Sequence, residues 1–138
     1  MPVIVVTRLR LRDPALFDEF FGHAVAVVEQ AQNSQGNLGA DVLAEANNTY
    51  WTRTAWHERD LMNAFVGSEP HLSTMDRIAD WCDEATFIDW EQASTDLPDW
   101  QDGYRRLAAD GQAASLTHAT RTHHTRDFPA PVLSPPEL

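Results

Sequence analysis

The stretch TRTAWHERDLMNAFVGSEPH, residues 52–71, decides the fold of this chain because the local pattern changes twice within it. TRTAW has the β-branched and aromatic residues that are typical of a strand. HERDLMNAFVG, residues 57–67, has the apolar spacing of a short amphipathic helix. Ser68 then suits the N-cap of a second helix, which we expect to run to about Cys82. A strand followed by two helices is therefore predicted.

The residues before this stretch predict one helix and three strands. Residues 3–11 alternate between apolar and other side chains, which indicates a first strand. Residues 14–31 have apolar side chains three and four positions apart and end at the turn residues NSQGNLG, so they predict a helix. Residues 40–45 and 49–56 predict two strands, and the short connection 46–48 favours an antiparallel hairpin.

Residues 86–91, rich in β-branched and aromatic side chains, predict a fourth strand. The order strand, helix, strand, strand, helix, strand predicts an α+β ferredoxin-like β-α-β-β-α-β domain, with an antiparallel sheet and helices on one face. The other face of such a sheet needs a cover. We expect a second copy of the chain to supply it, so a homodimer is predicted.

A further segment follows the predicted sheet. Residues 98–127 predict an extension that starts with a helix, and the alternation of Thr and His over residues 115–125 predicts an edge strand. Residues 128–138 are rich in proline, which predicts an extended arm or a loose tail. The expected organisation is one domain over residues 1–127, with its core at 3–95, followed by that arm.

Composition excludes several classes of function. The chain has 138 residues, of which 43% are hydrophobic, so it can bury one ordinary core. Its 10 basic and 21 acidic residues give a net charge of −11, which argues against nucleic acid and anionic membranes as partners. All basic residues are Arg, so lysine Schiff-base chemistry is excluded. Cys82 is the only cysteine, and the apolar start resembles a strand, so we expect a soluble protein of the cytoplasm.

The chain resembles the antibiotic-biosynthesis-monooxygenase-like (ABM-like) group of the dimeric α/β-barrel superfamily. The stretches that carry the resemblance are TRTAW, HERDLMNAFVGSEPH, IADW and the strand that holds Trp90. In that group the third strand ends in Trp and is followed by a short helix and a His-containing turn, where this chain has Trp56 and His71. The resemblance covers about residues 3–95. Residues 98–131 more loosely resemble the C-terminal region of an uncharacterised subfamily of these barrels, a domain of unknown function.

His71 is the candidate catalytic residue. Helical periodicity places it on the apolar arc of its helix, and a helix N-terminus disfavours the charged imidazolium. The resemblance implies a cofactor-independent monooxygenase that acts on an aromatic or polyketide-like small molecule. In such enzymes a deprotonated phenol or anthrone passes an electron to O₂ itself, and His71 would accept the proton.

The candidate substrate-binding residues are mostly aromatic. Trp residues could form the walls of an apolar pocket, and Arg53 or His23 could orient a substrate oxygen. The alternative is that the Trp side chains belong to the core and to an interface. The full set is Trp56, Arg53, Phe65, Met75, Trp81, Trp90 and His23.

Three other functions remain as alternatives. A non-catalytic small-molecule-binding protein of the same fold needs the same apolar cavity. Haem binding is implied by a sister group that degrades haem, but the positions of its ligand and pocket Trp hold Met75 and Phe65 here. A metal site at His118, His123 and His124 is disfavoured, because neighbours in a strand point to opposite faces, so we expect solvated strand positions there. Cys82 is expected to be an inert core thiol.

Overall fold

The computed structural model describes residues 1–133 and contains one mixed α+β domain. The predicted order of strands and helices is confirmed, and a short 3-10 helix (Pro14–Leu16) precedes α1. In chain order the first seven elements are β1 (Val3–Leu11), α1 (Phe17–Gln32), β2 (Asn37–Glu45), β3 (Thr49–Trp56), α2 (Arg59–Val66), α3 (His71–Trp81) and β4 (Cys82–Glu91). The remaining three are α4 (Trp100–Asp110), β5 (Gln112–Ala113) and α5 (Arg121–Thr125).

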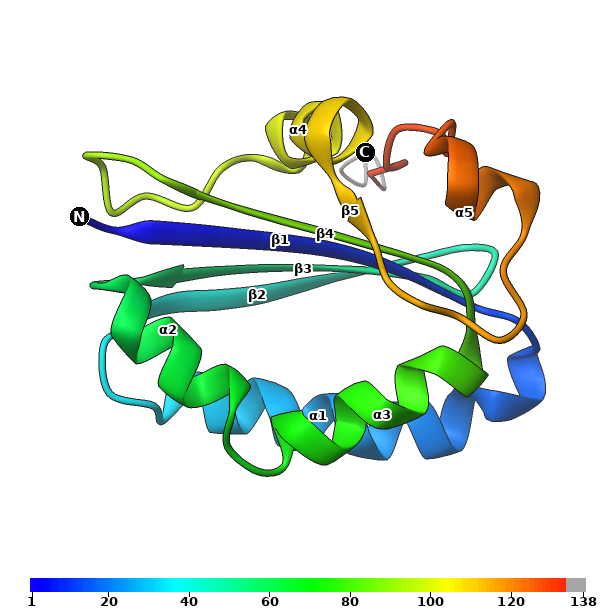
Figure 1. Ribbon diagram of the computed structural model, residues 1–138, viewed down its shortest axis with the longest axis horizontal. Coiled ribbons are helices and arrows are strands. Elements are labelled where there is room, and N and C mark those ends of the chain that lie inside the picture. The colour runs from blue at the N-terminus through cyan, green and yellow to red at the C-terminus, as the bar shows by residue number, and fades with distance from the viewer. Residues whose placement is uncertain (134–138) are drawn as a thin grey trace, which may run out of the picture.

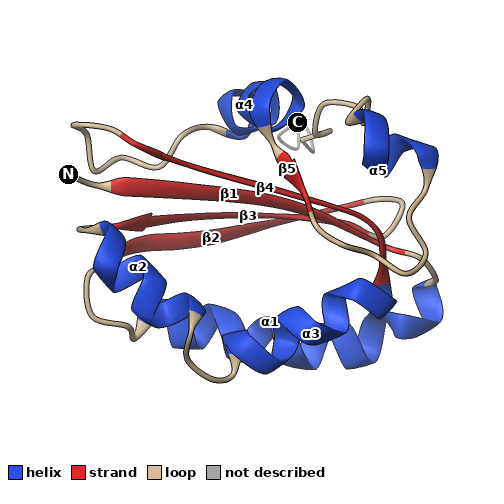
Figure 2. Cartoon of the chain, viewed as in Figure 1, coloured by secondary structure: helices blue, strands red, loops and turns tan. Residues whose placement is uncertain are grey.

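The strands form one antiparallel sheet in the order β2-β3-β1-β4-β5, with β1 at its centre. Helices α1, α2 and α3 cover one face of this sheet, and α4 and α5 lie on the other face (Figure 1). The domain therefore has three layers, with the sheet in the middle (Figure 2). We call the two sides of the sheet the α1–α3 face and the α4 face.

The alternation of β1 explains why both faces of the sheet are apolar. Val3 and Leu11 are fully buried among side chains of the α1–α3 face, whereas Ile4 and Val6 belong to the core cluster of the α4 face. Successive side chains of a strand point to opposite faces, so one strand of alternating apolar residues contributes to both clusters. The central strand is buried on both sides.

The α4 face is covered by the chain itself. Leu107 of α4 and Phe128 pack with Val6, Trp51 and Ala55 in one buried cluster. The homodimer was predicted because this face needs a cover, and the chain itself supplies one; the oligomeric state stays a prediction. The Pro-rich arm is described as far as residue 133, and its remaining residues, 134–138, lie outside the described part of the chain.

The edge strand predicted for residues 115–125 is wrong. The strand that pairs with β4 is β5, which contains two residues and precedes the predicted one. Thr120 instead caps the short helix α5, because its hydroxyl accepts a hydrogen bond from the backbone N–H of His123 at 3.3 Å. One of these Thr residues, Thr120, therefore serves as a helix cap, and the segment forms no strand.

His123 is buried, contrary to the expectation of a solvated position. Its Nδ1 accepts a hydrogen bond from the Ala85 N–H at 3.1 Å, and its Nε2–H donates to the Ala114 carbonyl at 2.7 Å. The imidazole thus bonds α5 to β4 through one nitrogen and to the loop after β5 through the other. Both ring nitrogens serve the fold.

Helix α3 begins later than the predicted N-cap at Ser68. The helix starts at His71, and the Ser68 hydroxyl donates to the Ala64 carbonyl at 2.6 Å, so Ser68 caps the last turn of α2. The carboxylate of Glu69 accepts the free backbone N–H of Ser73 at 2.7 Å and performs the capping. Within residues 1–133 no helix combines the length and the apolar character that crossing a membrane would require.

Candidate active site

His71 is held in one orientation by the end of α2 and by α1. Its Nδ1–H donates a hydrogen bond to the Val66 carbonyl at 3.0 Å. Its backbone N–H donates to Oε1 of Gln30 in α1 at 2.8 Å, and Nε2 of Gln30 donates to the Phe65 carbonyl at 3.2 Å. The turn between α2 and α3 is therefore tied to α1 at two points. The side chain of His71 has little freedom to rotate.

The protonation state of His71 suits a general base. Burial lowers the pKa of the imidazole below its ordinary 6.5, and the hydrogen bond to Val66 opposes this shift only in part. The ring is therefore neutral at pH 7, with its hydrogen on Nδ1. Nε2 carries the lone pair and has no hydrogen-bond partner in the described part of the chain. A substrate proton could be accepted there.

A stack of rings extends from His71 into the core. The rings of His71 and Phe65 have centroids 4.7 Å apart, and those of Phe65 and Trp56 are stacked at 4.9 Å. Trp56 is 0% exposed, and its Nε1–H donates to the Thr54 hydroxyl at 3.0 Å. Trp56 therefore supports the stack from behind. Of the three side chains, Phe65 and His71 are the ones placed to contact a ligand.

The middle of the α1–α3 face lies between two apolar clusters. Two separate apolar clusters occupy the two ends of the α1–α3 face, one around Val3 and Trp56 and the other around Leu11 and Trp81. The side chains between them are half-buried, and they belong to neither cluster. They are Thr7 and Thr52, which hydrogen-bond each other through their hydroxyls, and Phe87.

The length of α3 places His71 over this middle region. Trp81, the last residue of α3, packs in the cluster around Leu11, where β4 begins. Eleven helical residues span about 16 Å, whereas the ten residues of β4 span about 33 Å. By these lengths the first residue of α3 lies about halfway along β4, and its ring packs against Phe65 of the cluster around Trp56.

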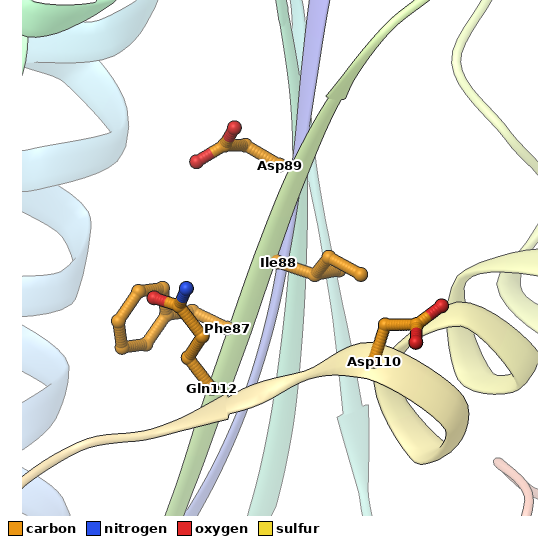
Figure 3. Close-up of a pocket in the computed structure, with 5 residues that line it drawn as sticks. All are labelled: Phe87, Ile88, Asp89, Asp110 and Gln112. Atoms are coloured by element: carbon orange, nitrogen blue, oxygen red, sulfur yellow. The ribbon is translucent and has the colours of Figure 1, made fainter.

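Two hollows occur in the described part of the chain, and His71 lines neither of them. One, of about 210 Å³, lies at the edge of β4 beside β5 and is lined by Phe87, Ile88, Asp89, Asp110 and Gln112. Figure 3 shows that Phe87 and Asp89 point to the side of the helices, whereas Ile88 and Asp110 point to the other side. The other hollow, also about 210 Å³, is lined by Ser34, Gln35, Leu61, Ala64, Phe65 and Ser68. Both are smaller than the usual pocket for a drug-sized ligand, which is about 300 to 1,000 Å³.

His23, Trp81 and Met75 lie on the same side of the sheet as His71. The rings of His23 and Trp81 have centroids 5.2 Å apart, and Nδ1 of His23 lies 3.5 Å from the hydroxyl of Thr74. Trp81 is buried in the cluster around Leu11, so it is a core residue. Met75, one turn after His71, is 45% exposed and forms part of the outer flank of α3.

The structure does not bring Arg53 and Trp90 to His71. Both point to the α4 face, so the sheet separates them from the candidate base. The guanidinium of Arg53 lies 4.2 Å from the ring centroid of Trp100 and donates to the Pro98 carbonyl at 2.7 Å. The guanidinium of Arg106 lies 4.1 Å from the centroid of the Trp90 ring. These two residues hold the extension on the sheet.

Sequence analysis did not identify Gln30, Thr7, Thr52 or Phe87 as site residues. Phe87 could have been found, because it alternates with Ala85, which faces the helices. Gln30 carried no signal, since a polar residue at the flank of an apolar stripe usually faces solvent. Its contact with His71 depends on how α1 and α3 lie side by side.

The sulfur and imidazole groups form no metal centre in residues 1–133, where no three metal-ligating side chains gather. Burial raises the pKa of the Cys82 thiol to about 12. His118 is exposed, and its Nε2 lies 3.5 Å from Oδ1 of Asp80.

No family model matches the chain. No curated protein matches its sequence either. Among solved structures, SnoaB from Streptomyces nogalater, a cofactor-independent oxygenase in its N63A form, aligns with a TM-score of 0.56 and 15% identity over 68% of this chain and 95% of its own. Rv0793 from Mycobacterium tuberculosis aligns with a TM-score of 0.60 and 16% identity, over 68% of this chain and 100% of its own. A structure described as an antibiotic biosynthesis monooxygenase aligns with a TM-score of 0.59 and 13% identity, over 67% of this chain and 99% of its own.

The chain has the ABM-like fold. These alignments include almost the whole of the ABM-like structures but only two thirds of this chain. The remaining third corresponds in length to residues 92–138, the part that follows β4. The ABM-like part alone supplies His71, Phe65 and the half-buried floor of the sheet.

Proposed function

We propose that the chain is a cofactor-independent monooxygenase that acts on a small, electron-rich aromatic molecule of the phenol or anthrone type. The observation that carries this proposal is the geometry of His71: Nδ1–H is bonded to a carbonyl, burial keeps the ring neutral, and Nε2 is free. The description of SnoaB as a cofactor-independent oxygenase supports the same reaction class.

The substrate itself would supply the electrons. His71 removes a proton from the substrate, and the resulting electron-rich anion reacts with O₂. For an anthrone, the reacting CH₂ carbon becomes a carbonyl, one oxygen atom stays on that carbon, and the other leaves as water. The protein contributes the base, a water-poor surface and the orientation of the substrate.

Phe65, which contacts His71, and side chains on the same face of the sheet would suit a flat aromatic ligand. Phe65 and Phe87 offer apolar rings, and the hydroxyls of Thr7 and Thr52 offer hydrogen bonds to a phenolic or quinone oxygen. Trp56 keeps Phe65 in place.

Haem degradation fits these residues less well. Met75, at the position of the haem ligand, lies on the exposed flank of α3, and Phe65 is stacked between two other rings. The proposed reaction therefore has no haem step.

Oxygen uptake with a panel of phenols and anthrones tests the proposal. We expect His71→Ala to reduce uptake by about 10² to 10⁴, the usual effect of losing a positioned base. His118→Ala is the matched control, because His118 is an exposed imidazole remote from the site. Tight binding of the same compounds without oxygen uptake would show a carrier, and equal rates in wild type and His71→Ala would remove His71 from the mechanism.

A further inference from the structure

We propose that the C-terminal segment, residues 126–133, takes the place of a partner subunit on the α4 face, so that the chain closes its own sheet and is a monomer. The inference concerns the extension alone and does not rest on the proposed function. It replaces the homodimer that the sequence predicts.

Phe128 is the centre of this cover. Its side chain is 2% exposed and makes edge-to-face contacts with Trp51 and Tyr104, with ring centroids 6.2 and 6.0 Å away. The guanidinium of Arg8 lies 4.5 Å from the centre of the Phe128 ring and donates to Glu84 at 2.7 Å. Phe128 therefore packs on the apolar centre of the face and also covers a buried ion pair.

The segment is fixed at both ends. At its start, the guanidinium of Arg126 donates to the carbonyls of Gly111 and Ala109 at the end of α4. At its far end, the N–H of Val132 donates to Oε1 of Glu45 at 3.0 Å, and the same oxygen accepts the indole N–H of Trp51 at 3.2 Å. Since Glu45 is the last residue of β2, the segment reaches the edge strand at the far side of the sheet.

Helix α5 fixes the chain just before this segment. His123 bonds β4 through Nδ1 and the loop after β5 through Nε2, and it is fully enclosed. The Thr120 N–H also donates to the Asp83 carbonyl at 3.1 Å. The cover is therefore attached along its length and does not depend on Phe128 alone.

Little of the α4 face remains for a partner. Ile4, Val6, Trp51 and Ala55 are all at most 1% exposed in the single chain. The solved structures that share the fold align with about two thirds of this chain, so they lack a counterpart for a segment of this length. A second copy could reach these residues only after displacing residues 126–133.

Two measurements on the full chain test the proposal. Sedimentation at micromolar concentration should give one species of 15.5 kDa. In a mixture of isotope-labelled and unlabelled chains, the NOEs between the rings of Phe128 and Trp51 should arise within one chain. A species of twice that mass, or NOEs that connect labelled to unlabelled chains, would overturn the proposal.

A pair of variants tests the cover directly. Phe128→Lys places a charge where the ring is buried and should increase the binding of a dye that reports exposed apolar surface by several fold. Val132→Lys, at a position 77% exposed, should leave dye binding unchanged. Equal dye binding by both folded variants would contradict the cover. If Phe128→Lys does not fold, the NOE measurement on the wild-type chain decides.

Discussion

Replacing Phe128 by alanine should destabilise the whole domain, although the residue lies ten positions from the C-terminus. The side chain is almost fully enclosed and belongs to the same cluster as Val6 and Trp51 of the central strands. A truncation there leaves a cavity between the sheet and the extension. It also removes the ring that covers the guanidinium of Arg8.

The size of the effect follows from the buried area. A Phe side chain buries about 150 to 250 Å², which at about 25 cal/mol per Å² corresponds to about 4 to 6 kcal/mol. Extended-chain references overestimate such areas by about 10 to 40%, and Ala retains part of the contact, so we expect a loss of about 3 to 4 kcal/mol. For a chain of this length, about 4 °C per kcal/mol gives a fall in Tm of about 12 to 16 °C.

Thermal and urea unfolding of the two proteins provide the measurement. Val132→Ala is the control, since its side chain is exposed and should change the free energy of unfolding by less than about 0.5 kcal/mol. A loss below about 1 kcal/mol for Phe128→Ala would refute the reasoning, because it would mean that the ring is not packed on the sheet in solution.

Three further predictions concern single positions. Because burial lowers the pKa of His71, activity should be lost on the acidic side only below pH 6.5. As the pH falls from 6.5, the unfolded chain binds the proton before the folded chain does, so the free energy of unfolding also decreases. His71→Ala should abolish this part of the decrease. Cys82 should resist iodoacetamide at pH 8 in the folded protein, because burial raises the pKa of its thiol to about 12, and it should react fully in urea. Rapid labelling of the native chain would disprove its burial. Gly36→Ala should reduce the free energy of unfolding by at least about 2 kcal/mol, because Gly36 has φ +83° and a Cβ there would meet Leu61. The control Gly22→Ala in α1, which has open space around it, should leave the melting temperature unchanged or raise it.

Periodicity predicted the ABM-like part well because its longer helices have one buried side and the side chains of its strands alternate between the two faces of the sheet. The helix at residues 17–32 and the strand at 3–11 follow their patterns closely. In the extension the helix expected after residue 98 is confirmed as α4, and only the strand predicted for residues 115–125 is wrong. A five-residue helix is too short to show a period, and the hydrogen bond of Thr120 is not specified by the sequence pattern.

The candidate site was only half predictable. Arg53 and Trp56 are three positions apart in one strand, so alternation alone already separates them, and sequence analysis overlooked this. Trp90 is five positions after Ala85 in β4, so the same alternation places it on the α4 face. Gln30 and Val66 act through tertiary contacts with His71, and such contacts leave no local pattern.

The position of β1 at the centre of the sheet has a consequence for the order of folding. Leu11 pairs with Cys82 and Val3 pairs with Glu91, so the partners on β4 are about 70 to 90 residues away. At a synthesis rate of about 5 to 20 residues per second, β1 waits several seconds for this partner to be made. During that time one edge of the most apolar strand is open to other nascent chains. Slow, late closure of the β1–β4 pair is therefore expected to limit the folding rate, and this interval is when aggregation competes with folding.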